Sequence, residues 1–176
     1  MEIRLAMPAD AAEIAAIYAY YVRETAITFA TEAPAAQDYV NRMADDRFPF
    51  LVAVDSGYVA GFTYAAPFRT KEAYRWDVEL TIYLTPGYEG RGIGRALMAQ
   101  CLQTLTKQGY LNAYSCITLP NERSIGLHRR FGFVELGTFC KTGYKLGKWH
   151  DVIWMGRELG KVSGQPAEPK LLSELC

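Results

Sequence analysis

Three glycines at alternate positions, Gly90, Gly92 and Gly94, follow a run of β-branched and aromatic residues at positions 78–84. After Gly94, apolar residues recur at the three- and four-residue intervals of one helix face. A strand, a glycine-rich turn and a helix start in succession can bind an anion, because glycine allows close backbone approach and the first N–H groups of a helix have no internal partner. The sequence therefore predicts a phosphate-bearing ligand over residues 90–95.

The spacing of these residues excludes two common phosphate-binding motifs. The nucleoside-triphosphate loop requires Gly-Lys-Ser/Thr after four spacers, and the sequence has no such stretch. The dinucleotide motif requires a third glycine where Arg95 stands, and an acidic residue at the end of a second strand, which is also missing. A glycine-rich turn that binds nothing remains the alternative interpretation.

Glu79 is a carboxylate in the otherwise apolar strand 78–84, beside the glycine-rich loop. A buried carboxylate next to a ligand site is suited to accept a proton, so Glu79 is the candidate general base. The alternatives are that Glu79 points to solvent or pairs with Arg75.

A cluster of cations and an aromatic residue precedes Glu79: Arg69, Lys71, Tyr74 and Arg75. Arginine can bind a carboxylate or phosphinate through two hydrogen bonds, and lysine adds a point charge. The cluster therefore predicts a pocket for an acidic group. A solvated, charged loop is the alternative.

The elements that must position these residues follow from the periodicity of the apolar side chains. They predict a mixed α/β fold, with a single domain over residues 1–160 and a loosely ordered tail at residues 161–176. A capping-box pattern at Asp10 and Glu13 predicts the start of the first helix. The predicted order is a strand at 3–6, helices from Asp10 and over 34–45, a hairpin over 50–65, the central strand at 78–84, a helix ending at Gly109, a strand at 111–118, a helix at 121–131 and closing strands at 133–139 and 150–159.

The composition favours neither nucleic acid nor an anionic membrane as a partner, because nineteen basic and nineteen acidic residues cancel. Two histidines are too few for a metal cluster, so we expect no metal. Four cysteines without paired spacing predict reduced thiols: Cys101, Cys116, Cys140 and Cys176. Because the sequence shows neither a signal peptide nor an apolar run of about eighteen residues, we expect a soluble, cytoplasmic protein.

The glycine spacing after a strand resembles the acetyl-coenzyme A loop of the GNAT acetyltransferases, with Glu89 where that family usually has Gln or Arg. The segments 67–79, 119–121, 124–128 and 143–152 resemble phosphinothricin N-acetyltransferases and their relatives that act on methionine sulfoximine and methionine sulfone. The resemblance runs from about Ile3 to Leu159. It implies the GNAT fold, a central mixed and strongly twisted sheet flanked by helices, and a homodimer.

The resemblance implies acetyl-CoA as the cofactor. Backbone N–H groups near residues 82–84 would polarise the thioester carbonyl. Asn121 would contact the coenzyme, and it can also cap the helix that follows it. The implied cofactor-binding residues are Ile82, Tyr83, Leu84, Gly90, Arg91, Gly92, Ile93, Gly94, Arg95 and Asn121.

The implied chemistry is acetyl transfer to an amine by direct attack in a ternary complex. An amine with a pKa near 8 is largely protonated at neutral pH, so the reaction needs a base, and Glu79 matches the family's proposed base. His128 stands where relatives carry the residue that protonates the leaving thiolate, and its ordinary pKa, about 6.5, suits that role. A packing histidine is the alternative. The cysteines show no activating neighbour, so no acetyl-cysteine intermediate is expected.

The resemblance also implies a pocket for a small amino-acid-like amine. The matching substrate-binding residues are Phe29, Arg69, Lys71, Tyr74, Thr81 and Tyr83. Two other functions stay open. A protein N-terminal or lysine acetyltransferase would need an open groove, and a non-catalytic acyl-CoA-binding sensor would bind the cofactor without Glu79.

Overall fold

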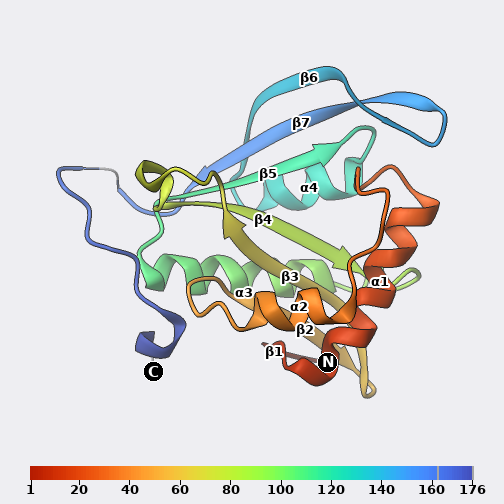
Figure 1. Cartoon of the computed structure of the whole chain (residues 1–176). Coiled ribbons are helices and arrows are strands. Elements are labelled where there is room, and N and C mark those ends of the chain that lie inside the picture. Colours follow the sequence, from red (N-terminus) through yellow and green to blue (C-terminus); the bar gives the residue numbers. More distant parts are fainter. Residues whose placement is uncertain (162, 176) are drawn as a thin grey trace.

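The computed structural model describes residues 1–161 and 163–175, and these residues form a mixed seven-stranded sheet covered by helices (Figure 1). The strand order is β1-β2-β3-β4-β5-β7-β6. Within the described chain, β4 and β5 form the parallel pair and the other neighbours are antiparallel. The strands are β1 Glu2–Leu5, β2 Phe50–Asp55, β3 Tyr58–Pro67, β4 Asp77–Leu84, β5 Asn112–Thr118, β6 Val134–Lys145 and β7 Lys148–Glu158.

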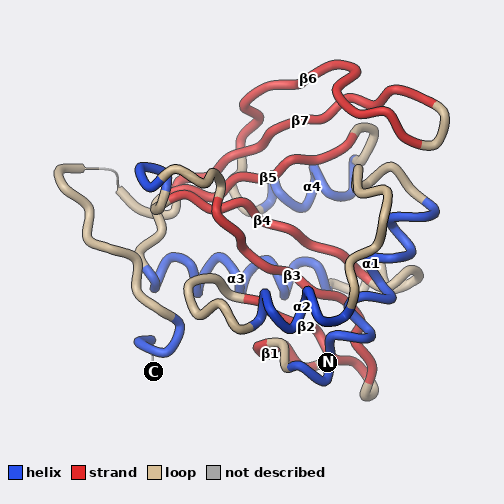
Figure 2. Tube along the Cα trace, in the orientation of Figure 1, coloured by secondary structure: helices blue, strands red, loops and turns tan. Residues whose placement is uncertain are grey.

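The helices lie on both faces of the sheet, as Figure 2 shows. The helices are α1 Ala11–Glu24, α2 Ala36–Met43, α3 Ile93–Gln108 and α4 Glu122–Arg130. In one core, α3 and α4 pack on Val78 and Leu80 of β4, and in the other, α1 and α2 pack on residues such as Phe62 of β3. Because consecutive side chains of a strand face opposite sides, β4 contributes Glu79, Thr81 and Tyr83 to the face opposite α3. The mixed α/β fold predicted from the sequence is confirmed.

The two closing strands are longer than predicted, because β6 and β7 continue into one hairpin that extends from the body of the domain (Figure 1). Its turn is Leu146-Gly147, with φ angles of 50° and 78°. Two consecutive residues with positive φ match the right-handed twist of paired strands, which explains the tight turn. Among the helices of the described residues, none is both long and apolar enough to cross a membrane.

The parallel pair of strands separates halfway along its length. The pairing of β4 with β5 runs from Asp77↔Asn112 to Glu79↔Tyr114, whereas β4 continues to Leu84 and β5 to Thr118. Figure 1 shows the two strands diverging from this point. The divergence leaves the second half of β4 unpaired on its β5 side, and Glu79 is the last residue of β4 that pairs with β5.

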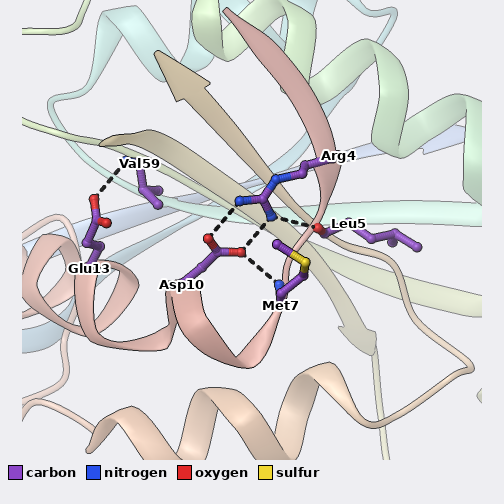
Figure 3. Close-up of polar contacts among 6 residues, drawn as sticks. All are labelled: Arg4, Leu5, Met7, Asp10, Glu13 and Val59. Carbon is purple, nitrogen blue, oxygen red and sulfur yellow. Dashed lines mark hydrogen bonds and ion pairs between the residues drawn. The ribbon is translucent and has the colours of Figure 1, made fainter. Parts of the chain in front are cut away.

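The capping box predicted at Asp10 and Glu13 is wrong. The Asp10 carboxylate accepts hydrogen bonds from the Met7 N–H at 2.7 Å and from both terminal nitrogens of Arg4 at 2.7 and 2.8 Å (Figure 3). Glu13 accepts from the Val59 N–H at 2.8 Å instead of from its own helix. A short 3₁₀ turn precedes α1, so Asp10 caps that turn and joins it to the first strand.

The Arg4–Asp10 pair makes stability depend on pH. The Arg4 hydrogen bonds, with the Met7 N–H, hold the pKa of Asp10 below its ordinary value of 3.8. A carboxylate with a lowered folded-state pKa stabilises the fold above its unfolded-state pKa, and this stabilisation is lost as the pH falls through the folded-state pKa. We expect Asp10→Asn to lower the free energy of unfolding by about 2 kcal/mol at pH 7, and the deficit to shrink at pH 3. Denaturant titrations at both pH values measure it.

Asp38→Asn is the matched control for that experiment. Asp38 accepts the Ala35 N–H at 2.8 Å at the start of α2, is exposed and has no arginine partner among the described residues. A deficit for Asp10→Asn that is no larger than for Asp38→Asn, or that does not change with pH, would contradict the role of the ion pair.

The segment after Gly160, expected from its composition to be loosely ordered, makes hydrogen bonds to the domain. The Trp76 indole N–H donates to the Ala167 carbonyl at 2.8 Å. The Lys170 N–H donates to the Gln108 carbonyl at 2.7 Å, and the Gln108 side chain returns a bond of 2.9 Å to the Lys170 carbonyl. These bonds place the segment against the C-terminal end of α3 and the loop before β4.

Candidate functional site

Two cavities adjoin where β4 leaves β5. The larger has a volume of about 900 Å³ and lies between the end of β4, the start of α3 and α4. The smaller has a volume of about 250 Å³ and lies over the face of β4 that carries Glu79. Both are lined by Ile82, Tyr83 and Asn121, so the cavities share a wall. The arrangement suits two reactants that meet at this wall.

The glycine-rich loop forms one end of the larger cavity. Gly90 and Gly92 have φ angles of 78° and 81°, which glycine adopts without strain. Gly92 is the N-cap of α3, and within the described residues this helix end has neither a side-chain cap nor an acidic residue in its first turn. The first N–H groups of α3 therefore remain available at the positive end of the helix dipole, which is the arrangement predicted for a phosphate.

The predicted cofactor residues fall around this cavity with one exception. Ile82, Tyr83, Leu84, Gly90, Gly92, Ile93, Gly94, Arg95 and Asn121 line it. Arg91 is absent from the described lining, and its guanidinium lies 4.6 Å from the centre of the Tyr88 ring. Glu89 bends back to accept the Gly87 N–H at 3.0 Å, so this carboxylate supports the loop where the family usually has Gln or Arg.

Sequence analysis missed several residues of the larger cavity. Arg123, Leu127 and Arg130 all line it from α4. Their spacing of four and seven residues marks one helix face, a signal that could have identified them. From α1, the Tyr21 hydroxyl donates to the Leu84 carbonyl at 2.7 Å, and burial raises the pKa of Tyr21 to about 12. Tyr21 therefore remains a neutral donor that holds the end of β4.

Glu79 lies in the wall of the smaller cavity with Phe29, Thr81 and Tyr83. Burial raises the pKa of Glu79 above its ordinary value of 4.5, and the positive charge of Arg69 partly opposes this rise. The alternative pairing with Arg75 does not form, because the Arg75 guanidinium binds Glu168 at 2.8 Å. A half-buried carboxylate with a raised pKa is a stronger proton acceptor than an exposed one.

His128 lines the smaller cavity and has 2% of its surface exposed. Its Nδ1 is 2.8 Å from the Ser124 carbonyl oxygen, which can only accept, so Nδ1 carries the proton in the neutral ring. Its Nε2 is 3.0 Å from the Ser115 hydroxyl, which then donates to it. Burial lowers the pKa of His128 below 6.5. The imidazole is therefore neutral at pH 7, and Ser115, absent from the sequence-based site, connects it to the cavity.

The cation cluster before β4 lies apart from the described cavity linings. The Arg69 guanidinium packs 4.1 Å from the centre of the Phe68 ring and acts on Glu79 through its charge. Tyr74 contacts the edge of Phe68, with the ring centres 6.1 Å apart, and Lys71 is an exposed residue that begins a 3₁₀ turn. Of the predicted substrate residues, Phe29, Thr81 and Tyr83 line the smaller cavity, and Arg69, Lys71 and Tyr74 do not.

Cys116 also lines the smaller cavity and was missing from the sequence-based site. Burial raises the pKa of this thiol to about 11. The reactive thiolate is therefore scarce at neutral pH, which disfavours a covalent role for Cys116.

Comparisons with known proteins give matches that cover most of the chain. The model of the Acetyltransferase (GNAT) domain matches residues 3–154. The chain is 36% identical over 160 residues to the phosphinothricin N-acetyltransferase of Streptomyces viridochromogenes, over 90% of this chain and 87% of the relative. It is 31% identical over 173 residues to the L-methionine sulfoximine/L-methionine sulfone acetyltransferase of Salmonella typhimurium, over 95% of this chain and 99% of the relative. Its structure is similar to that of a GNAT superfamily phosphinothricin acetyltransferase from Sinorhizobium meliloti in complex with AcCoA, with a TM-score of 0.89, 35% identity and coverage of 95% and 93%.

Proposed function

Because the chain belongs to the GNAT acetyltransferase family, we propose that it transfers the acetyl group of acetyl-CoA to the amine of a small amino-acid-like substrate. Phosphinothricin, methionine sulfoximine and methionine sulfone, named for its relatives, define the substrate class. The observation that carries the proposal is the wall shared by the two cavities, with Glu79 on the smaller side. The proposed path is direct attack of the amine in a ternary complex.

The hydrogen-bond donors and positive charges that line the larger cavity suit the phosphates of acetyl-CoA. The uncapped N-terminus of α3 offers N–H groups to a pyrophosphate, and the α4 arginines Arg123 and Arg130 add positive charge to the same cavity. The coenzyme supplies an activated thioester. The second half of β4, which β5 does not pair, presents backbone groups beside it.

Glu79 is the proposed general base. The substrate amine must lose a proton to become a nucleophile. The Glu79 carboxylate lies in the wall of the smaller cavity, which would hold this amine. Because burial raises the pKa of Glu79, its affinity for the proton is greater than that of an exposed glutamate. For His128 we propose the role that the resemblance implies, protonation of the leaving thiolate. Its Nε2, unprotonated in the neutral ring, would first take up a proton by way of the Ser115 hydroxyl and then give it to the thiolate, and both residues line the smaller cavity.

The size of the smaller cavity supports a small substrate. A volume of about 250 Å³ suits an amino acid, and the cavity is bounded by Phe29, Tyr64 and Val152. A protein acetyltransferase would instead need room for an extended peptide.

The test is release of coenzyme A from acetyl-CoA with a panel of amines. The panel holds phosphinothricin, methionine sulfoximine, methionine sulfone, the common amino acids, a polyamine and an N-terminal peptide. Saturable turnover is expected on one of the first three. Turnover on the peptide alone would favour a protein acetyltransferase, and acetyl-CoA binding without turnover would favour a non-catalytic sensor.

Arg69 should affect the pKa of Glu79, the proposed base, rather than the affinity for the substrate. Removing its charge by Arg69→Met should raise the pKa of Glu79 further, since that charge now lowers it. Glu79 acts as a carboxylate, so the acid limb of kcat/KM should move to higher pH, and the plateau at high pH should change little. A pH profile measures both.

Arg75→Met is the control for Arg69→Met, because the Arg75 guanidinium is committed to the exposed Glu168. An acid limb that stays in place in Arg69→Met would contradict the charge effect. A fall of the plateau with a raised amine KM would instead restore the substrate-binding role predicted from the sequence.

We also propose a homodimer formed through the β6–β7 hairpin. The hairpin exposes six large apolar side chains, each between 56% and 62% accessible: Val134, Leu136, Phe139, Tyr144, Leu146 and Trp149. Apolar side chains gathered on one extended hairpin are typical of an interaction surface. Light scattering after gel filtration should give twice the chain mass, and Trp149→Glu should lower it toward the monomer.

We place the protein in the cytoplasm. Cys101, Cys116 and Cys140 are free thiols, which is typical of reducing compartments.

A further inference from the structure

The loop after α1 carries one wall of the smaller cavity and is held by the β6–β7 hairpin. Thr28 and Phe29 line the cavity. The buried Lys145 amine, near the turn of the hairpin, donates to the Thr28 carbonyl at 2.6 Å and reaches the Tyr21 carbonyl at 3.5 Å. One cation thus ties the last turn of α1 and the loop to the hairpin.

The hairpin holds Lys145 in turn. The His150 Nε2 donates to the Lys145 carbonyl at 3.0 Å, and His150 is buried. Gly143 is the register partner of His150 across the two strands. The Phe29 and His150 rings have their centres 6.2 Å apart. These contacts bring Gly143 and Phe29 together.

Gly143 leaves space that the Phe29 ring fills. A Cβ at this position would lie 2.2, 2.4 and 2.5 Å from three carbons of that ring. The φ angle of Gly143 is not in the positive range, so the backbone itself does not require glycine. Contact with the ring is what favours glycine here. Phe29 lines the cavity whereas Gly143 does not, so the ring lies between the hairpin and the cavity.

We propose that Gly143 is a specificity-determining residue: its missing side chain lets the Phe29 ring withdraw against the hairpin, and this sets the width of the amine pocket. A Cβ at position 143 displaces the ring toward the cavity and narrows it. The inference rests on the proposed function, since it identifies the smaller cavity as the amine pocket. It assigns part of substrate selection to a residue that does not touch the substrate.

Gly143→Ala tests the proposal, with Gly137→Ala as the matched control. Gly137 lies in the same strand, has no positive φ and has nothing within 4 Å of the position of an added Cβ. In Gly143→Ala, we expect the KM for methionine sulfone, or for the best amine of the panel, to rise about tenfold. The KM for acetyl-CoA should stay near that of the wild type, because the larger cavity does not include Phe29. Gly137→Ala should change neither constant.

A second substitution, at Phe29, distinguishes an effect of the contact between position 143 and the Phe29 ring from a general loss of structure. Phe29→Leu shortens the side chain and removes the clash, so Phe29→Leu/Gly143→Ala should bind the amine as Phe29→Leu does alone. The double variant also keeps the proposal testable if Gly143→Ala fails to fold. Light scattering on every variant checks that the oligomer is unchanged.

Three outcomes would overturn the inference. One is an unchanged amine KM in Gly143→Ala. Another is an equal rise, in Gly143→Ala, of the KM for the amine and the KM for acetyl-CoA. The third is an effect of Gly143→Ala that Phe29→Leu does not remove. Wild-type protein that acetylates no amine would refute the proposed function itself, which distinguishes that failure from the failure of the role of Gly143.

Discussion

Glu79→Gln is expected to lower kcat by about a hundredfold to ten-thousandfold, the range measured for removing a general base. Glutamine keeps the shape of the side chain but cannot accept the amine proton. Acetyl-CoA should bind as it does to the wild type, because Glu79 lines the smaller cavity and is absent from the larger one. Stopped-flow or steady-state release of coenzyme A gives kcat, and calorimetry gives the acetyl-CoA affinity.

The pH profile adds a second readout for Glu79. As the proposed base, Glu79 works as a carboxylate, so kcat/KM should fall as the pH drops through the pKa of this group. Because burial raises that pKa, the fall should occur above pH 4.5, the ordinary value, and should vanish in the residual activity of Glu79→Gln.

Glu72→Gln is the matched control for Glu79→Gln, since Glu72 is exposed in the loop before β4 and absent from both described cavity linings. Full activity in Glu79→Gln would refute the general base. Weak acetyl-CoA binding by that variant would indicate a structural role instead.

Gly92→Val is expected to weaken acetyl-CoA binding about tenfold or more. Valine at a φ of 81° is strained, and left-handed backbone costs an L-residue about 1–2 kcal/mol. The loop would relieve this strain by moving the first N–H groups of α3 away from their present position. The dissociation constant of acetyl-CoA, measured by calorimetry, reports the effect directly.

Gly87→Val is the control that distinguishes backbone strain in the loop from loss of acetyl-CoA binding. Gly87 has a φ of 88°, lies in the same loop and does not appear in the described lining of the larger cavity. The two variants should lose similar stability on heating, and only Gly92→Val should lose affinity. Equal affinities in both variants would argue against an anion site at the start of α3.

The sequence predicted those backbone features around the candidate site that local patterns determine. The glycines before α3 and the Gly109 cap after it follow from backbone geometry, and Gly109 has the φ of 93° expected of a C-cap. Asn121 caps α4 by accepting the Ser124 N–H at 3.2 Å. Glu79 was predicted to be a carboxylate in an otherwise apolar strand, and in β4 it lies between the buried Val78 and Leu80. Each of these signals needs only a few neighbouring residues.

Contacts between segments that lie far apart in the sequence could not be predicted from such local patterns. The Phe29 ring meets Gly143, more than a hundred positions later, and no local pattern links them. Asp10 was expected to form a capping box, but its carboxylate binds Arg4 of the first strand. The charges of Arg69 and Lys71 suggested a binding loop, and composition alone does not fix where such a loop points.

The separation of β4 from β5 after three residue pairs divides the sheet into two halves. The half of the sheet before the split carries the glycine-rich loop and the candidate base, and the half after it carries the hairpin that supports Phe29. Residues from both halves line the larger cavity, because α4 follows β5, but Phe29 and Gly143 are absent from its described lining. Under the role proposed for Gly143, substitutions at this end of the hairpin should change which amine is accepted and leave the coenzyme site as it is. The choice of amine can therefore be altered through residues of the hairpin that lie outside the coenzyme cavity.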